Sequence, residues 1–390
     1  MSKHGRFEQA KPQKSGKKKT VLIVFGVVLA ILVAAVIAAV CYYNAFLNKI
    51  PRAEHEEKVV SQEDIDAILN FERGDSVDAT VAPAASTEAT EATVVETTIA
   101  TEPAVQTAED ITNILVIGDA SRGGGEESHM ADTMILVSVN KFTKTITLTS
   151  FLRDTYVKLP DFKDSSGTQH TCGRNKLTTC YALGYAWGGT ADAMDMLDQC
   201  LYENFGIEVD FNVEVGFEGV EQIVNYFGGL EFDLTQEEAD YLNADKNYVM
   251  YPVSAGPQVL DGLATLSYAR MRKASGDNDS DIKRTSRQRV VLEKLIDKVR
   301  DADVAGLKRL MEDFMEYIVT DMTNSDITKC MVDIFPLVAD LKLEQGTCPV
   351  ESTYWGEGVE MDGYTSYVLK FDEGQNKKLM KAITEGVAAN

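Results

Sequence analysis

An uncharged apolar segment, Thr20 to Tyr43, constrains this chain more than any other feature of its sequence. A helix needs about 20 such residues to cross the hydrocarbon core of a bilayer. Lysines and arginines crowd the stretch before the segment, whereas Glu54, Glu56 and Glu57 follow soon after it. The positive-inside rule then predicts a cytoplasmic N-terminus and an extracellular chain beyond the segment.

The composition of this segment favours an uncleaved anchor over a cleaved signal peptide. A signal peptide has a shorter apolar region, of about 7–15 residues, and ends in small residues. This segment is longer and ends in Val40-Cys41-Tyr42-Tyr43. A lipoprotein site at Cys41 is disfavoured because Val40 replaces the small residue expected before it. We therefore expect a single-pass membrane protein with its C-terminal domain outside the cell.

Composition divides the remaining chain. Residues 75–110 are rich in Thr, Ala, Val and Glu and contain no aromatic residue, so they cannot bury enough surface to offset chain entropy. Residues 62–71 have the pattern of a short amphipathic or ordinary helix. The expected parts are a basic tail at 1–19, the transmembrane helix at 20–43, a juxtamembrane segment and linker at 44–110, a main domain at 111–325 and a C-terminal extension packed on it at 326–390.

Hydrophobic patterns predict alternating strands and helices in the main domain and its extension. The expected strands are 111–117, 133–140, 144–150, 209–215, 230–234 and one within 262–272. The expected helices are 191–205, 217–226, 285–299, 305–317, 326–341 and 375–388. This alternation indicates an α/β class, with a mixed central β-sheet covered by helices on both faces.

Five cysteines lie after residue 110, an odd number that leaves at least one thiol over. Disulfides are permitted outside the cell. We expect Cys330–Cys348 as one pair and Cys172–Cys180 as another. The chain contains no C-x-x-C pair, which argues against zinc-ribbon and thioredoxin-type sites.

A concentration of arginines, Tyr268 to Arg289, stands out in a protein whose net charge is −23. We call it the arginine island. On the strand expected here Arg270 and Arg272 would share a face, and Arg284, Arg287 and Gln288 would share one side of a helix start. Guanidinium groups match phosphate oxygens two at a time. The island therefore predicts a site for a compact anion such as a diphosphate, because the net charge repels nucleic acid.

Three further motifs follow or begin expected strands: I-G-D-A-S-R-G-G-G at 117–125, A-D-T at 131–133 and S-F-L-R-D-T at 150–155. Their carboxylates Asp119, Asp132 and Asp154, near arginines, suit a magnesium-bound phosphate site. Other chemistries find less support. The chain has no G-x-x-x-x-G-K-[ST], H-E-x-x-H or G-x-S-x-G motif, which leaves a Ser-His-Asp triad as a remote alternative.

Taken together and in order, these motifs resemble the LytR–CpsA–Psr family of membrane-anchored cell-wall glycopolymer ligases. The resemblance runs from about residue 112 to 295 and weakens towards the C-terminus. The motifs that carry it are Ser121-Arg122, Ala131-Asp132-Thr133, Ser150-Phe151-Leu152-Arg153-Asp154, Lys176-Leu177, Gly188-Gly189, Leu260-Asp261-Gly262, Tyr268-Ala269-Arg270-Met271-Arg272 and Asp281-Ile282-Lys283-Arg284-Thr285-Ser286-Arg287-Gln288.

The resemblance implies a ligase-type phosphotransferase. Such an enzyme moves an anionic glycopolymer, teichoic-acid-like or capsular, from an undecaprenyl diphosphate carrier to a peptidoglycan hydroxyl. It also implies an apolar tunnel for the prenyl chain and Mg²⁺ (or Mn²⁺) held by Asp119 and Asp132. Asp132, Arg153 and Asp154 are the implied catalytic residues. The implied diphosphate ligands are Arg122, Arg153, Lys176, Arg270, Arg272, Arg284, Arg287 and Gln288.

The sequence departs from the family pattern at three positions. Ala120 stands where the family has its metal aspartate, Met130 replaces an arginine, and Thr178 replaces an asparagine. These changes keep two alternatives open. One is a non-catalytic protein that binds polyprenyl phosphates or wall polymer and regulates wall assembly. The other is a pyrophosphatase that acts on the lipid carrier, with water in place of the sugar hydroxyl.

Overall fold

The computed structural model describes residues 43–56, 68, 107, 110–119, 129–164, 167–271, 281–302, 304–334, 342–361 and 364–386. The chain divides into two compact units, Met1–Lys49 and Ile50–Asn390. In the first, residues 43–47 are helical. The predicted transmembrane helix, except Tyr43, and nearly all of the predicted helix at 62–71 lie outside the described residues. No helix within the described ranges is long and apolar enough to span a bilayer.

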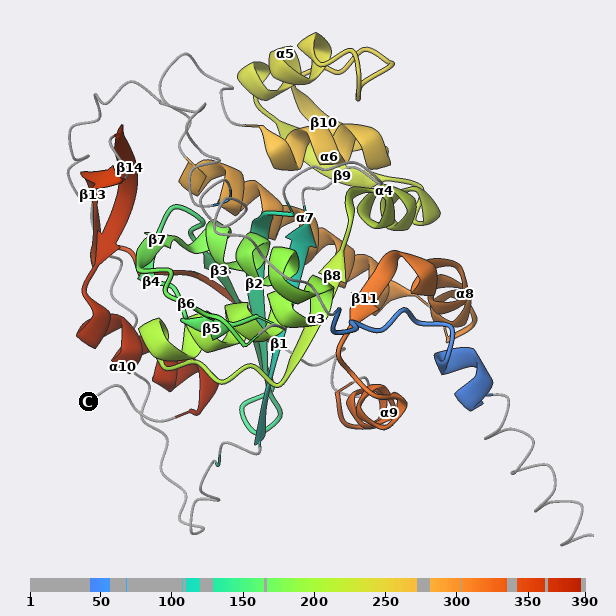
Figure 1. The fold of residues 1–390 in the computed structure, drawn as a ribbon. Coiled ribbons are helices and arrows are strands. Elements are labelled where there is room, and N and C mark those ends of the chain that lie inside the picture. The colour runs from blue at the N-terminus through green and yellow to red at the C-terminus, as the bar shows by residue number, and fades with distance from the viewer. Residues whose placement is uncertain are drawn as a thin grey trace, which may run out of the picture. The chain divides into compact units, whose positions relative to one another are not determined.

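A six-stranded mixed sheet forms the centre of the second unit (Figure 1). Its strands, in spatial order, are β11 (Ile318–Thr320), β8 (Phe211–Val215), β1 (Ile111–Asp119), β2 (Ala131–Asn140), β3 (Thr145–Phe151) and β12 (Lys342–Cys348). β1, β2 and β3 are antiparallel neighbours, whereas β8 pairs in parallel with β1 and β12 in parallel with β3. The predicted mixed sheet is confirmed. β12, which the sequence patterns missed, covers the edge beside β3.

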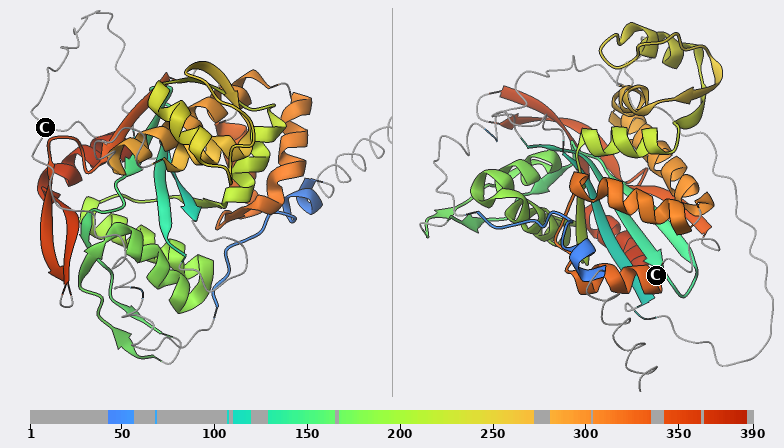
Figure 2. Two further views of the ribbon diagram at one scale, coloured as in Figure 1. Left: turned by 90° about the horizontal axis from the view of Figure 1, so that it is seen from above. Right: turned by 90° about the vertical axis from the view of Figure 1, so that its right-hand side faces the viewer.

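Helices lie on opposite faces of this sheet (Figure 2). On one face, Leu115, Ile117 and Met134 pack in one cluster with the helix α3 (Leu177–Phe205). On the other face, Ile135, Val139, Ile146 and Leu148 pack against α7 (Asp281–Asp301) through Leu292 and Ile296. Successive side chains along the strands therefore point alternately into two separate cores, as expected for a sheet covered on both faces.

α3 is two helical segments joined at Gly188 and Gly189, whose backbone angles are not helical. Gly189 has φ 81°, a conformation that glycine adopts readily. A Cβ on Gly184 would lie 2.5 Å from the Cα of Ala193, so a glycine there lets the two segments approach closely. The helix predicted at 191–205 is thus the second segment of a longer element.

A smaller layer stands beyond the end of β8, at the top of Figure 1. Its elements are α4 (Phe217–Tyr226), β9 (Leu230–Leu234), α5 (Gln236–Ala244), β10 (Gly256–Leu260) and α6 (Gly262–Arg270). They share a second core with the middle of α7, including Val224, Phe232 and Val291. The predicted boundaries of α4 and β9 are confirmed.

The strand predicted within residues 262–272 is wrong, because Gly262–Arg270 form the helix α6. Asp261 caps the helix by accepting a hydrogen bond from Ala264 N at 2.9 Å, and such a cap favours a helix start. Arg270 therefore occupies the last turn of a helix. The shared strand face predicted for Arg270 and Arg272 does not exist, and Arg272 lies outside the described residues.

The C-terminal region continues with α8 (Val304–Phe314), a short 3₁₀ helix (Met315–Tyr317), α9 (Asn324–Asp333), the β13–β14 hairpin (Tyr354–Met361 and Tyr364–Phe371) and α10 (Glu373–Thr384). Small two-stranded sheets formed by β4 (Tyr156–Lys158) with β7 (Arg174–Lys176), and by β5 (Phe162–Lys163) with β6 (Gln169–His170), precede α3.

Residues 51–56, placed in the linker by the sequence, belong to the second unit and pack against the edge of its sheet. Arg52 forms a parallel bridge with Thr320, and Ala53 N donates to Thr320 O at 3.0 Å. His55 Nδ1 lies 3.0 Å from Asp192 on α3. This stretch therefore extends the β11 edge of the sheet.

All five cysteines after residue 110 are free thiols, so the predicted pairs Cys172–Cys180 and Cys330–Cys348 are wrong. Cys172 and Cys180 belong to the core beneath α3. Burial raises the pKa of the Cys172 thiol to about 11 and that of Cys348 well above its usual value. Both thiols are consequently protonated at neutral pH and act as small apolar side chains.

Candidate functional site: a cation-rimmed apolar cavity

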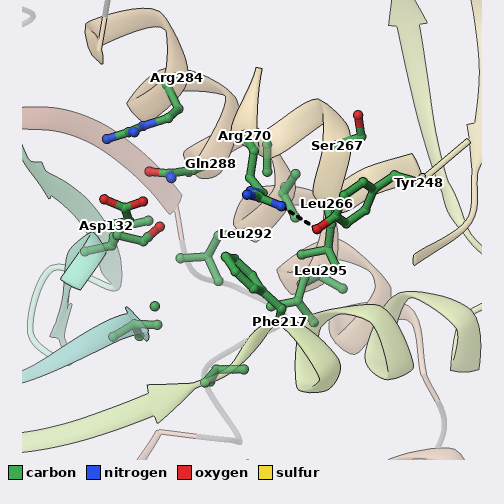
Figure 3. A pocket seen from close by; sticks show the side chains of 18 of the residues that line it. Asp132, Phe217, Tyr248, Leu266, Ser267, Arg270, Arg284, Gln288, Leu292 and Leu295 are labelled. Atoms are coloured by element: carbon green, nitrogen blue, oxygen red, sulfur yellow. Dashed lines mark hydrogen bonds between the residues drawn. The ribbon is translucent and has the colours of Figure 1, made fainter. Parts of the chain in front are cut away.

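A cavity of about 480 Å³ opens between the ends of β1 and β2 and the helices α4, α6 and α7 (Figure 3). Its apolar lining comes from all of these elements. The apolar residues are Val116, Ile117, Ile135, Val215, Phe217, Val220, Leu266, Ala269, Val291, Leu292 and Leu295. A cavity of this size with mainly apolar walls and a few polar groups suits an elongated hydrophobic ligand that carries a polar end.

The arginine island supplies one polar side of the cavity. Arg284 and Gln288 stand four residues apart on α7, so their side chains share a helix face, and both line the cavity. Arg284 is 2% exposed. Figure 3 shows these two side chains opposite Asp132 of β2. Two residues predicted to bind the diphosphate therefore lie at the same mouth as a predicted catalytic carboxylate.

Arg270 reaches the cavity from the end of α6 and is held between aromatic rings. Its Nη1 donates to the Tyr248 hydroxyl at 2.6 Å. Its Cζ lies 4.9 Å from the centre of the Phe217 ring and 5.3 Å from that of Tyr248. Cation–π contacts restrict where a guanidinium can go. Arg270 is thus held in position before a ligand binds. Nothing in the sequence indicated the two aromatic residues, Phe217 and Tyr248, that hold it.

Arg287 does not line the cavity, although the sequence grouped it with Arg284. Its Nε lies 3.2 Å from Glu238 Oε1, and its Nη1 donates to Met271 O at 3.0 Å. Burial, followed by the Glu238 carboxylate, raises the pKa of Tyr268 to about 12, and Arg287, which lies over the Tyr268 ring, opposes the shift. Arg287 therefore ties α7 to α5 and to the end of α6.

A second cationic cluster adjoins the cavity through Asp132. Arg153 Nη1 donates to Asp132 Oδ1 at 2.6 Å, and Lys176 Nζ lies 3.2 Å from Asp154 Oδ1. Arg153 Nε is also 3.8 Å from Asp154 Oδ1. The loop after β3 and the end of β7 thus bring together four predicted site residues. Charge alternates along the cluster, and only Asp132 among the four lines the cavity itself.

Asp119 and Asp132 have different surroundings, although Asp119 pairs with Ala131, the residue before Asp132. Asp119 continues the face of β1 that carries Leu115 and Ile117, and it is 3% exposed. Its Oδ2 lies 2.8 Å from His129 Nδ1, and the His129 ring stacks on Tyr185 of α3 with centroids 3.5 Å apart. Asp119 therefore joins the polar group on the α3 side of the sheet and does not line the cavity.

Glu214 of β8 belongs to the same polar group. The Tyr181 hydroxyl donates to Glu214. Burial is the main cause of the raised pKa of Glu214, and the nearby Asp119 carboxylate raises it further, while the Tyr181 hydrogen bond and His129 oppose the shift. Two acids and a histidine thus lie together on this side of the sheet; of the three, only Asp119 belongs to a motif that the sequence indicated.

The neighbourhood of Asp132 tests whether a magnesium ion fits. No group of three or more Asp, Glu, His or Cys side chains suited to a metal occurs among the described residues. Mg²⁺ nevertheless binds through one or two carboxylates when substrate phosphates and water complete its shell. Asp132 lines the cavity and fits that arrangement, whereas Asp119 contacts His129 and does not line the cavity.

Four polar residues in the cavity were not predicted. Asp245 and Ser267 line it, and the Ser267 hydroxyl donates to Asp245 Oδ2 at 2.6 Å. Tyr241 and Tyr248 are the other two. All four come from α5, the segment after it and α6, which carry no spacing that distinguishes a site residue. Of the predicted residues, Arg122 and Arg272 lie outside the described part of the chain.

The chain is similar to proteins of a known family. The LytR_cpsA_psr family matches residues 76–384. The teichoic acid transferase TagU of Enterococcus faecalis is 28% identical over 235 residues, 60% of this chain and 69% of that protein. Biofilm regulatory protein A of Streptococcus mutans is 30% identical over 263 residues, 65% of this chain and 56% of that protein. The second match thus spans little more than half of the relative's length.

A solved structure shares the fold. The crystal structure of Bacillus subtilis TagT superposes with a TM-score of 0.52, at 24% identity, over 74% of this chain and 96% of that one. At this identity the likeness concerns the arrangement of helices and strands. The mixed sheet with helices on both faces is therefore an architecture that this chain shares with TagT.

Proposed function

The chain belongs to the LytR_cpsA_psr family, and from that membership we propose that it transfers an anionic glycopolymer from a polyprenyl diphosphate carrier to a peptidoglycan hydroxyl. The observation that carries the proposal is the cavity whose apolar walls end at Arg270, Arg284 and Gln288. TagU of Enterococcus faecalis is a polyisoprenyl-teichoic acid–peptidoglycan teichoic acid transferase by name. The glycopolymer here is teichoic-acid-like or capsular.

The apolar part of the cavity would take the prenyl chain. Phe217, Leu292 and Leu295 line it from two helices, and Val116 and Val215 from two strands. Burying apolar surface contributes about 25 cal/mol per Å², so even part of a prenyl chain supplies several kcal/mol of binding. This energy would keep the carrier in place while its head group reacts.

The mouth of the cavity would hold the diphosphate. Arg270 and Arg284 are side chains suited to bidentate contacts with phosphate oxygens, and Gln288 adds a neutral donor. Arg153 and Lys176 supply further positive charge beside Asp132. Phosphoryl transfer depends on positioning and charge neutralisation more than on covalent help from the protein. Arg122 and Arg272 complete the proposed set from the sequence.

Asp132 has two proposed roles at this mouth. Its carboxylate would hold Mg²⁺ (or Mn²⁺) together with diphosphate oxygens, and the ion when bound neutralises charge on the reacting phosphate. Asp132 or its neighbour Asp154 would accept the proton of the attacking hydroxyl. The hydroxyl oxygen then forms a bond to the sugar-linked phosphorus, the bridging P–O bond breaks, and polyprenyl phosphate leaves. Asp119 has no part in this proposal as a metal ligand.

A second candidate function has one specific observation in its favour. Ala120 occupies the family's metal-aspartate position, and Asp119 beside it turns to His129 instead of the cavity. A protein with one carboxylate fewer at its metal site would bind polyprenyl diphosphates without transferring the polymer. Hydrolysis of the carrier by water is the third outcome. The arginines of the cavity serve all three functions equally.

The proposed place of action is the outer face of a cell membrane. The apolar segment 20–43 would anchor the chain, with the N-terminus in the cytoplasm. A lipid-linked substrate in the same membrane would then reach the cavity without leaving the bilayer surface.

The decisive experiment supplies the purified full chain, in mild detergent, with a lipid-diphosphate-linked sugar, peptidoglycan oligomers and Mg²⁺. A phosphodiester-linked product that disappears in an Arg270→Ala variant supports the transferase. Lipid binding without product supports the binding protein, and free sugar phosphate supports the pyrophosphatase. Absence of all three outcomes would contradict the proposed use of the cavity.

A further inference from the structure

The β13–β14 hairpin carries an exposed sheet face that the proposed transfer chemistry does not use. Direct cross-strand pairs place six residues on this face, because paired residues of an antiparallel ladder point the same way. The pairs are Gly356–Leu369, Gly358–Tyr367 and Glu360–Thr365. All of these except Leu369, which is half-buried, are exposed. We call this surface the glycine face.

Tyr367 lies flat on the glycine face. A Cβ added to Gly356 would come within 1.6 Å of the Tyr367 hydroxyl and 2.3 Å of its Cζ, so the ring occupies the space of the missing side chain. One side of the ring therefore rests on the backbone of β13. Tyr367 is nevertheless 48% exposed, although large aromatic residues are normally covered by other parts of the protein. The arrangement presents the other side of the ring to solvent as a platform.

The platform is connected to the cationic cluster of the site. Leu369 N donates to Asp154 O at 2.9 Å, and Leu369 forms a parallel bridge with Thr155. Asp154 in turn contacts Lys176 and Arg153. Tyr367 is two residues from Leu369 on the same face, which is about 7 Å along a strand. A ligand stacked on Tyr367 would thus lie within one or two sugar units of the Asp154 backbone.

The chemistry of this face selects one kind of occupant. None of its six residues is basic, and its one charged group is Glu360, whose Oε1 accepts from Thr365 Oγ1 at 2.6 Å. The face therefore offers no positive charge that would pair with an anionic polymer. A protein interface needs several buried anchors over about 800 Å² per partner, and this face offers one. An uncharged, hydroxyl-rich polymer matches both the bare ring and the carboxylate.

We propose that the glycine face binds the acceptor glycan strand, with a sugar ring stacked on Tyr367 and sugar hydroxyls donating to Glu360. The C–H bonds on the apolar face of a pyranose meet the negative face of the aromatic ring. This inference rests on the proposed function for the identity of the polymer. It assigns to the hairpin the task of presenting an acceptor hydroxyl to the Asp132–Arg153 side of the site.

Binding is measured first without any donor lipid, so that its result does not depend on transfer. The full chain in mild detergent is titrated with a β-1,4-linked N-acetylglucosamine tetramer and sedimented with insoluble peptidoglycan. Tyr367→Ala is expected to weaken tetramer binding at least fivefold. Gly356→Ala is expected to do the same, because its new Cβ must displace the ring. Tyr367→Phe keeps the platform and should retain wild-type affinity.

Trp355 provides the matched control. It is 51% exposed, lies on the opposite face of the hairpin, and donates to Glu357 at 3.2 Å. Trp355→Ala removes at least as large an aromatic group from the same hairpin and should bind the tetramer within twofold of wild type. The proposal is overturned if wild type binds neither glycan, if Trp355→Ala loses as much affinity as Tyr367→Ala, or if an anionic glycopolymer binds this face more tightly.

Transfer kinetics then separate this inference from the proposed function. With active protein, Tyr367→Ala should raise the KM for the acceptor and leave the affinity for the lipid diphosphate unchanged. An unchanged acceptor KM overturns the inference and leaves the transferase standing. If the protein shows no transfer activity but still binds glycan in a way that depends on Tyr367, the proposed transferase function is overturned and the proposed glycan site stands.

Discussion

Arg153 Nη1 lies 2.6 Å from Asp132 Oδ1, so the loop after β3 is tied to the start of β2 at the mouth of the cavity. The Arg153 side chain is 10% exposed and that of Asp132 29%. Removing one partner of such a pair leaves the other charge poorly compensated. The contact joins the two halves of the proposed site, one that binds the carrier and one that faces the acceptor.

Arg153→Lys should lower transfer about 10- to 100-fold while the protein stays folded. Lysine keeps the charge but loses the planar fork that reaches both Asp132 and Asp154. The measurement is kcat together with the melting temperature. Lys158→Arg, at an exposed pair with Glu203 away from the cavity, is the control. Full activity in Arg153→Lys would contradict a geometric role for Arg153.

Arg270 and Arg287 give opposite predictions although both belong to the arginine island. Arg270→Ala should weaken binding of a short polyprenyl diphosphate by about 1–3 kcal/mol, since charge-assisted hydrogen bonds are lost. Arg287→Ala should leave the affinity within threefold, because Arg287 bonds to Glu238 and Met271 O. It should instead lower the melting temperature. Isothermal titration and thermal unfolding distinguish the two, and equal losses of affinity would refute the assignment.

Leu295→Trp should shorten the lipid that the cavity accepts. The larger ring would enter a cavity of about 480 Å³ from the α7 side. We expect affinity for long-chain polyprenyl diphosphates to fall more than tenfold, while affinity for a short-chain diphosphate changes little. The comparison of the two ligands in one variant serves as its own control. Equal losses for both would mean that the prenyl chain lies elsewhere.

The two aspartates should differ in their effect on metal dependence. Asp132→Asn is expected to raise the Mg²⁺ concentration for half-maximal transfer at least tenfold, because Asp132 alone of the two lines the cavity. Asp119→Asn is expected to leave that concentration unchanged and to lower stability by about 1–3 kcal/mol, since a buried contact with His129 is altered. A larger metal effect in Asp119→Asn would reverse this assignment.

A buried carboxylate away from the site predicts a pH dependence of stability. Asn212 Nδ2 donates to Asp198 at 2.7 Å and to Asp321 at 2.9 Å. Burial raises the pKa of Asp198 to about 7 from 3.8, with Asp321 adding to the shift and the Asn212 hydrogen bond opposing it. Because the pKa of Asp198 is raised in the folded state, the stability that the protonated Asp198 contributes is fully present below about pH 4. It is lost as the pH rises towards about 7.

Asp198→Asn should flatten this dependence. The variant carries no ionisable group there, so its free energy of unfolding should change less between pH 4 and 8 than that of wild type. The difference is expected to be about 1–3 kcal/mol, which urea unfolding at several pH values measures. Glu237→Gln, which changes an exposed acid on α5, is the control. Parallel pH curves for wild type and Asp198→Asn would refute a buried protonated Asp198.

Local patterns of apolar residues were sufficient to predict most of the strands. β1, β2, β3 and β9 have alternating or continuous apolar positions, and the turn between β2 and β3 has Asn140 Oδ1 accepting from Phe142 N and Thr143 N. α6 was mistaken for a strand because its nine residues are short and mostly apolar, a case in which periodicity does not decide. The cap at Asp261 was the signal that identifies the helix.

The sequence by itself determined the chemistry of this protein: guanidinium groups in two clusters, acidic residues beside them, an apolar segment before them, and a succession of motifs typical of one family. Only the tertiary structure decided which of these groups meet. Residue order cannot tell that Arg287 turns to Glu238 or that Asp119 turns to His129. Those directions depend on helix rotation and on which face of β1 each core covers. The aromatic residues around Arg270 converge from distant segments, so no local spacing records them.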